Sequence, residues 1–306
     1  MDSLESKSLA LLLACDGIGH VTARHILSAV RLAALSWEEF WVAGSATLEK
    51  VGLQERIINS IKKTVKEYTI DSYSELLLSK NIRVVTECQA EYPQLLREIE
   101  QPPVALFAKG KTMVWNAANV PIAVVGTRHM TAYGRMATEK ITYELVTLGA
   151  SIISGCMYGV DTCAHTTALS EGGETVGVLG YGFDFVYPRS HAGILADFLN
   201  QGICLMTPFA PKVRPNKGNF PARNAIVAGM SAAVVVTEAS EKSGTHITAT
   251  CAAEYGRPVC AVPGPINNPY CRGTKWLINQ GAVLIGSGDE VYESLGISAQ
   301  WGGTEN

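Results

Sequence analysis

The residues best suited to bind an anion lie in Phe198–Thr237, a stretch of the 306-residue chain that contains no aspartate or glutamate. Within it, Lys217 and Arg223 stand on either side of Phe220. Two such cations can neutralise phosphates while the ring between them stacks an unpaired base, as single-stranded nucleic acid requires. The alternative is structural: Phe220 caps the core and Arg223 pairs with Glu238. The spacing alone leaves both interpretations open.

A second set of candidate residues stands at the ends of strand-like apolar runs. Gly126, Thr127 and Arg128 follow the first of these runs, and Ser243-Gly244-Thr245 stands where a helix begins after a later one. Glycine lets the backbone turn tightly, and an arginine fork can meet a phosphate. A small residue, a glycine and a hydroxyl at a helix N-terminus also suit an anion. These strand ends therefore predict an anion site.

The sequence contains none of the common patterns of catalytic and metal sites. The six histidines show no HExxH spacing, and the eight cysteines form no CxxC pair. It has no GxGxxG and no Walker lysine motif, so ordinary dinucleotide or nucleotide binding lacks its usual support. We expect His165 to be a packed or capping residue, and Asp161 to cap a helix that begins near Cys163. The sequence predicts no metal, no cofactor and no catalytic residue.

Composition and charge limit the class of protein. The net charge of −3 excludes a uniformly basic nucleic-acid coat, and 47% hydrophobic with 17% charged residues predicts a substantial core. No apolar run reaches the roughly 20 residues of a membrane helix, and no signal-peptide pattern is visible. We therefore expect a cytoplasmic protein whose cysteines are buried and reduced.

Hydrophobic patterning divides the chain into four parts. Residues 1–70 are predicted to form a small helical domain, with a break at Gly17–Gly19 that is similar to a helix-hairpin-helix turn. Residues 71–119 read as a bridging segment packed on the sheet. Residues 120–296 alternate continuous apolar strands with helices, one of them over Asn224–Gly229, which predicts a doubly wound α/β domain of Rossmann type. Residues 297–306 form a short tail.

The strand-end motifs of this domain, taken in order, resemble those of the DNA-processing protein A family (DprA, also called Smf). The motifs are Gly126-Thr127-Arg128, Tyr133-Gly134, Ser154-Gly155, Gly159-Val160-Asp161, Ala164-His165, Tyr187-Pro188, Phe220-Pro221, Arg223-Asn224, Ser243-Gly244, Pro263-Gly264 and Gly281-Ala282. Upstream, Glu91-Tyr92-Pro93, Gln101-Pro102-Pro103 and Gly17-Ile18-Gly19 match its N-terminal part. The resemblance extends from about residue 9 to 295.

The resemblance implies an extended Rossmann fold behind a small helical domain. It implies a dimer that binds and protects single-stranded DNA and hands it to the recombinase RecA in natural transformation. The family's DNA-contacting arginine falls on Arg128, its loop lysine and aromatic on Lys217 and Phe220, and its later arginine on Arg223. The residues expected to bind DNA are Gly126, Thr127, Arg128, Ser154, Gly155, Lys217, Phe220, Arg223, Asn224, Ser243, Gly244 and Thr245.

The chain departs from the family pattern at two basic positions. Tyr158 stands where arginine is common, and Ala225 follows Asn224 where a second arginine is usual. Both changes remove positive charge and predict a lower affinity for DNA. Many members carry a winged helix at the C-terminus; only residues 297–306 follow the last motif here, which is too short for one, so either this branch lacks it or the sequence was cut before it.

Two other classes of function remain open at the level of sequence. Related Rossmann proteins include phosphoribohydrolases of nucleoside monophosphates, and Glu238 with Ser243-Gly244-Thr245 faintly resembles their site. The loop with its trailing glutamate that such an enzyme needs is missing from the sequence. The remaining alternative is a module that senses a nucleotide. Binding to an oligonucleotide, compared with a panel of mononucleotides, discriminates among these classes.

Overall fold

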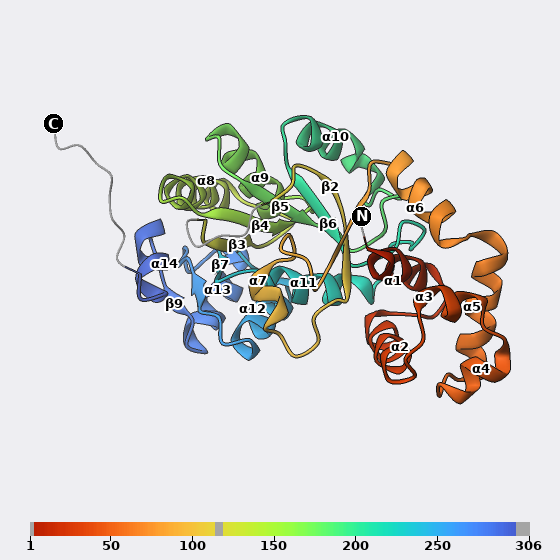
Figure 1. Cartoon of the computed structure of the whole chain (residues 1–306). Coiled ribbons are helices and arrows are strands. Elements are labelled where there is room, and N and C mark those ends of the chain that lie inside the picture. The colour runs from red at the N-terminus through yellow and green to blue at the C-terminus, as the bar shows by residue number, and fades with distance from the viewer. Residues whose placement is uncertain (1–2, 114–118, 298–306) are drawn as a thin grey trace.

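The computed structural model describes residues 3–113 and 119–297, and in them nine strands form one sheet (Figure 1). The strands are β1 (Arg83–Thr86), β2 (Ala105–Gly110), β3 (Pro121–Val125), β4 (Ser151–Gly155), β5 (Thr175–Val178), β6 (Cys204–Thr207), β7 (Ala233–Val236), β8 (Val259–Ala261) and β9 (Val283–Leu284). Their order is β1-β2-β6-β5-β4-β3-β7-β8-β9. The strands from β3 onward pair in parallel, and β1 and β2 add an antiparallel edge beside β6. The predicted mostly parallel, doubly wound sheet is confirmed.

Helices cover both faces of the sheet, as Figure 1 shows. On one face lie α8 (Ala132–Thr147), α9 (Val160–Ser170), α10 (Ala192–Asn200) and, against α8, α14 (Gly288–Ser294). On the other lie α7 (Gln94–Arg97), α11 (Asn219–Gly229), α12 (Thr245–Glu254) and α13 (Arg272–Asn279). In β3, Ile122 and Val124 belong to the core on the α8 side of the sheet, whereas Ala123 and Val125 belong to the core on the α11 side. This burial on both sides is the reason why the strands read as continuous apolar runs.

A helical unit packs against the β1 and β2 edge. Its helices are α1 (Leu4–Ala14), α2 (His20–Leu32), α3 (Trp37–Val42), α4 (Ser45–Lys50), α5 (Glu55–Glu67) and α6 (Ile70–Ser79). Helix α1 is buried at its centre, and its apolar residues share one core with Val84 and Phe107 of the sheet. Arg24 of α2 donates to the Glu87 carboxylate and to the Pro102 carbonyl, both at 2.7 Å. The helices are thus held to the sheet by apolar packing and by polar contacts at its rim.

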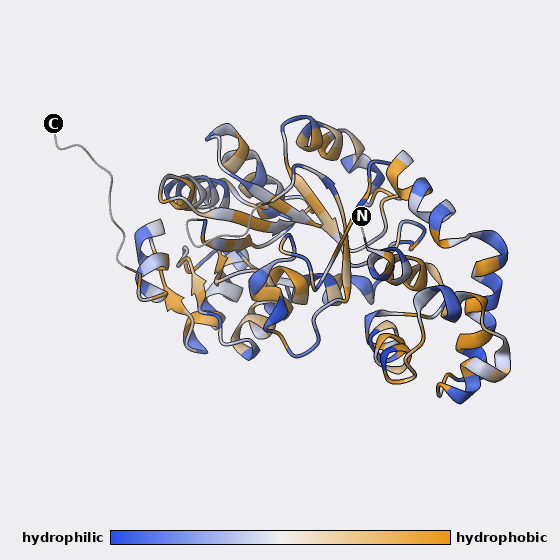
Figure 2. Ribbon diagram, in the orientation of Figure 1, coloured by the Kyte–Doolittle hydropathy of each residue, from blue (hydrophilic) through white to orange (hydrophobic). Residues whose placement is uncertain are grey.

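The hydropathy colouring of Figure 2 follows this layering, with apolar residues in the strands and polar residues on the outer turns of the helices. The segment predicted as a bridge, residues 71–119, supplies two strands of the sheet itself, β1 and β2. Most of the predicted tail lies outside the described residues. No helix among the described residues is both long enough and apolar enough to cross a membrane.

The connections around β3 create a crevice at the carboxyl edge of the sheet. After β3 the chain enters α8 on one face, and after β7, the neighbour of β3, it enters α12 on the opposite face. Because the two loops diverge, a gap opens between them at the strand ends, where doubly wound sheets bind their ligands. The fold therefore brings the loops that follow Val125 and Val236 to opposite sides of one crevice.

Two helix starts differ from the sequence-based expectation. Helix α11 begins at Asn219 instead of Asn224, because the Asn216 side chain accepts hydrogen bonds from the Gly218 and Asn219 amides and closes the preceding loop. Phe220 is therefore in the first turn of a helix. Helix α9 begins at Val160, so Asp161 lies inside the helix and the prediction that it caps the helix is wrong.

Candidate functional site

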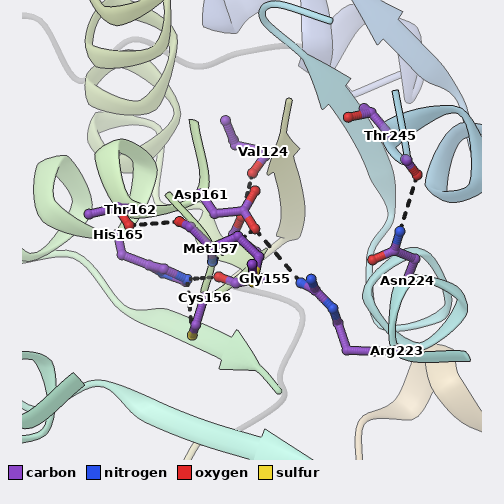
Figure 3. A network of polar contacts seen from close by, with 12 residues as sticks. Val124, Gly155, Cys156, Met157, Asp161, Thr162, His165, Arg223, Asn224 and Thr245 are labelled. Carbon is purple, nitrogen blue, oxygen red and sulfur yellow. Dashed lines mark hydrogen bonds and ion pairs between the residues drawn. The ribbon is translucent and has the colours of Figure 1, made fainter. Parts of the chain in front are cut away.

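A cleft of about 240 Å³ occupies the crevice. Its walls come from the ends of β3 and β4, from α11, and from the loop that leads into α12. Seven of the predicted residues line it: Gly126, Arg128, Arg223, Asn224, Ser243, Gly244 and Thr245. The Asn224 amide donates to the Gly244 carbonyl at 3.1 Å and so ties α11 to the start of α12 (Figure 3). The fold thus assembles most of the predicted set at one place.

Arg223 lies deeper than its predicted role suggests. Its side chain points at Asp161 (Figure 3), with Nη1 3.7 Å from Oδ2, and only 5% of the residue is exposed. Burial raises the pKa of the Asp161 carboxyl, and the neighbouring guanidinium opposes that shift. The Arg223 Nε has no hydrogen-bond partner among the described residues. The alternative pairing of Arg223 with Glu238 is wrong, because Glu238 accepts from Thr131 and Asn268.

The residue next to the Arg223–Asp161 pair, Gly155, has to be a glycine. A side chain at Gly155 would collide with the Arg223 guanidinium. The Gly155 carbonyl accepts a hydrogen bond from the His165 ring at 2.6 Å. The last residues of β4 thus give Arg223 the space to reach Asp161.

Two further predicted residues use their hydroxyls for hydrogen bonds within the protein. Ser154 is buried and donates to the Val124 carbonyl at 2.7 Å, and the buried Thr127 hydroxyl accepts from the His129 amide at 3.1 Å. Their hydroxyls join the strand ends and shape the loop that carries Arg128. Direct contact between these two residues and a ligand stays a prediction.

Phe220 is half-buried and is not among the residues that line the cleft, and within the described residues it belongs to none of the apolar core clusters. The Arg128 guanidinium carbon lies 5.8 Å from the centroid of its ring, and the Tyr187 ring centroid is 5.5 Å away. A side chain at Gly180 would come within 3.1 Å of the ring, so the backbone packs closely against it. The ring is supported by the protein without being a core residue.

The cations around the crevice differ in how firmly they are held. Within the part of the chain that the structure describes, no carboxylate lies within ion-pair distance of Arg128, Lys217 or Lys242. Lys217 is exposed in the loop before α11, and Lys242 lines the cleft. By contrast, Lys212 of the same acid-free stretch binds Glu67 at 2.7 Å. Within the described residues, Arg128 and Lys242 therefore present positive charge at the crevice without an ion-pair partner.

His165 is a packed residue, as expected. It is fully buried, and its Nδ1 lies 2.7 Å from the Thr175 hydroxyl. Burial lowers its pKa to about 4, so the ring is neutral near pH 7. Cys156, 3.9 Å from that ring, is also buried, and burial raises the pKa of its thiol to about 12. Neither group is poised to transfer a proton or attack a substrate. Over residues 3–113 and 119–297, no cluster of histidine, cysteine and carboxylate side chains could hold a metal ion.

Sequence reasoning missed some residues of the site. Lys242 directly precedes Ser243-Gly244-Thr245, so its position beside the predicted helix start was a usable signal. Asp161 was seen only as a possible cap, because its partner Arg223 comes from another helix. Tyr187 was noted only as part of a motif, and nothing in the sequence places it beside Phe220.

Fold and site together define the class: a Rossmann-type α/β protein with a cationic crevice at the switch point of its sheet. The family model described as DNA recombination-mediator protein A matches residues 83–296. The chain belongs to this family.

Individual relatives agree with the assignment. The chain is 36% identical over 270 residues to Protein Smf of Escherichia coli, a match that covers 85% of this chain and 70% of that protein. It is 38% identical over 216 residues to DNA processing protein DprA of Bacillus subtilis, covering 71% and 72%. The structure of DNA processing protein A from Streptococcus pneumoniae matches with a TM-score of 0.76 and 29% identity over 96% of this chain and 98% of that one.

A second solved structure carries information about a ligand. It concerns the single-stranded DNA binding mode of DNA processing protein A from Helicobacter pylori. It matches with a TM-score of 0.60 and 26% identity, and covers 70% of this chain and 95% of that one.

Proposed function

We propose that this protein binds single-stranded DNA at the carboxyl edge of its sheet and acts in DNA recombination without catalysing a reaction. The observation that carries the proposal is a set of three cations with no carboxylate partner among the described residues: Arg128 over the supported ring of Phe220, Lys242 in the wall of the cleft, and Lys217 in the loop before α11. Membership of a recombination-mediator family supports it. So does the relative from Helicobacter pylori, whose structure concerns single-stranded DNA binding.

The proposed binding has two physical components. Phosphates bind the cations and release counterions, so affinity falls as salt rises, with a slope of about −0.7 for each phosphate neutralised. A base stacks on Phe220, which is worth roughly 1–3 kcal/mol. The Arg128 guanidinium lies over that ring in the free protein, and we expect it to turn toward a phosphate when a base takes its place.

Stacking makes the proposed preference for single strands testable. A base in a duplex is already stacked and paired, so it cannot reach the Phe220 ring. The test is anisotropy titration of a labelled oligonucleotide, its duplex of equal length, and mononucleotides as competitors. We expect tight binding of the single strand, weaker binding of the duplex, and little sequence dependence. Equal affinity for duplex and single strand would sink the stacking mechanism.

The absence of turnover is the second part of the proposal. In the phosphoribohydrolase alternative, Glu238 would act on a nucleotide. Glu238 is fully buried, however, and its carboxylate accepts hydrogen bonds from the Thr131 amide and hydroxyl and from Asn268. Incubation with nucleoside monophosphates, NAD and ATP should leave each of them unchanged. Release of free base in proportion to protein, lost in Glu238→Gln, would support the enzyme instead.

The partners follow from the family role. We propose that the DNA complex is delivered to the RecA recombinase in the cytoplasm, which is tested by RecA filament formation on DNA that this protein has first coated. We also propose a homodimer through the β9 end of the sheet, where four exposed apolar side chains lie: Ile266, Trp276, Val283 and Leu284. Light scattering should give a dimer, and Trp276→Glu should give a monomer.

A further inference from the structure

A second, larger groove of about 670 Å³ adjoins the cleft. The two share three wall residues, Arg128, His129 and Met157, so the same loop ends border both. The groove runs along the N-terminal parts of α8 and α9 and past the loop at Tyr187. Its volume lies in the range of roughly 300–1,000 Å³ typical of ligand sites.

Tyr158 is held in the wall of this groove. Its hydroxyl hydrogen-bonds the Ser190 hydroxyl, and its ring meets the His191 ring edge-on with centroids 3.8 Å apart. The loop passes directly against the end of β3, because Gly159 has φ +79° and a side chain there would collide with the Thr127 carbonyl. Tyr158 nevertheless remains 39% exposed. The protein thus holds the ring in place and leaves part of it open to the groove.

Tyr187 is a second aromatic residue of this groove, and its ring packs against Phe220. It lines the groove, remains 41% exposed, and lies 5.5 Å from the Phe220 ring, centroid to centroid. Its own carbonyl accepts a hydrogen bond from the Tyr181 hydroxyl, which holds the loop in place. Phe220 and Tyr187 are thus in ring contact, and Tyr187 and Tyr158, from separate segments, line the same groove. Rings held in this way bind at a low cost in conformational entropy.

The groove also carries charge suited to a phosphate. Arg128 and Arg135 line it, with Glu139 as a partly exposed neighbour 3.7 Å from Arg135. An ion pair that long and that exposed is weak, so a phosphate can compete for Arg135. The groove thus combines open aromatic faces with an available cation, which are the two components that single-stranded nucleic acid needs.

We propose that this groove is a second nucleotide subsite, in which Tyr158 and Tyr187 stack the bases that follow the one at Phe220 along the same DNA strand. The proposal rests on the proposed function and extends it to a specific path. In this subsite Arg135 offers one phosphate contact, whereas Tyr158 and Tyr187 contribute by stacking, which does not depend on salt. The expected consequence is that affinity rises with DNA length and that the share due to the two tyrosines adds little to the salt dependence.

The first test measures affinity against oligonucleotide length, from about 2 to about 16 thymidines. Tyr158→Ala should weaken the longer strands about 5- to 20-fold, leave the shortest unchanged, and keep the salt slope. Tyr158→Phe keeps the ring and should bind as the parent does. The matched control is Tyr143→Ala on α8, since Tyr143 is 50% exposed but lines neither groove. A structural role of the Tyr158 hydroxyl would instead make Tyr158→Phe as weak as Tyr158→Ala, which would overturn the proposal.

The second test requires no substitution. Photocrosslinking to an oligonucleotide that carries 5-iodouracil, followed by peptide mapping, should label Tyr158 and Tyr187 but not Tyr143. If neither is labelled and Tyr158→Ala binds every length normally while Arg128→Ala weakens binding, the second subsite is wrong and the proposed function stands. If Arg128→Ala and Lys217→Ala also bind normally, the proposed function itself fails, and the subsite with it.

Discussion

Two regions of this molecule offer what a phosphate needs, but only one leaves its charges free. The turn before α2, Gly17–Gly19, borders a cavity of about 440 Å³ with Lys63 and Lys212 in its wall. The crevice at the end of β3 offers glycines, a helix start and cations as well. Each region even has a cation over an aromatic ring, with Lys212 5.0 Å from the Tyr68 centroid. Residue types alone do not separate the two.

The two regions differ in whether their cations are paired with carboxylates. At the turn, Lys63 binds Asp16 and Lys212 binds Glu67, both at 2.7 Å. The Glu67 and Tyr68 contacts raise the pKa of Lys212, which shows that its charge is already stabilised by the protein. A phosphate there would have to displace a carboxylate, whereas at the crevice it meets Arg128 and Lys242, which have no carboxylate partner among the described residues. The number of cations in a region therefore says less about binding than their freedom does.

The largest effect is expected from a substitution that breaks the buried ion pair of the crevice. Asp161→Ala leaves Arg223 buried without a counter-charge, and the free energy of unfolding should fall by about 3 kcal/mol. The comparison is Asp71→Ala in the helical unit, which removes the exposed partner of Lys7 and should cost less than about 1 kcal/mol. Urea unfolding of both variants measures the contrast. Equal stability of the two would mean that solvent reaches Arg223 well enough to replace Asp161.

Phe220→Ala sharpens the comparison of the two aromatic rings. It should cost roughly 1–3 kcal/mol of DNA affinity and leave the salt slope nearly unchanged, because it removes stacking and no charge. The counterpart Tyr68→Ala should leave affinity unchanged, since its cation is bound to Glu67. A thermal melt of both variants separates binding from folding. A sharp loss of stability in Phe220→Ala with normal binding per folded molecule would make Phe220 a structural residue.

Acid should destabilise the strand-end region through His165. Burial lowers its pKa to about 4 from an ordinary value near 6.5, so the unfolded chain binds the proton more readily. The stabilisation is fully present above pH 6.5 and is lost as the pH falls toward 4, and the loss amounts to roughly 1–2 kcal/mol at pH 5.5. Comparing the unfolding free energy at pH 7.5 and 5.5 for the parent and His165→Gln isolates this contribution. An unchanged pH dependence in the variant would contradict the assignment.

The smallest expected effects are those of single cations. Arg128→Ala and Lys217→Ala should each reduce the salt slope of DNA binding by about 0.7. Lys63→Ala and Lys212→Ala should leave the slope as it is, because these cations are paired with carboxylates. Anisotropy titrations over a range of salt concentrations decide the matter. A reduced slope in the Lys212 variant would move the DNA path toward the helical unit.

The amino-acid sequence by itself determined the sheet and the place of the site on it. Short, β-branched apolar runs such as 122–125 and 233–236 predict strands covered on both faces, and the glycines and hydroxyls after them predicted where the loops turn. These signals are local, since a few neighbouring residues carry each of them. Seven of the predicted binding residues do line the cleft for that reason.

Only the tertiary structure decided which of the charged and aromatic groups are available. Lys212 and Glu67 are 145 residues apart in the sequence, and nothing around either residue announces the other. Likewise, Arg223 is committed to Asp161 of another helix, and Tyr187 meets the Phe220 ring and shares a groove with Tyr158 only after three segments have packed. Whether a cation is paired with a carboxylate or buried depends on contacts between distant segments. The sequence therefore sets the residue type of each cation, and the fold sets whether that cation is free to bind DNA.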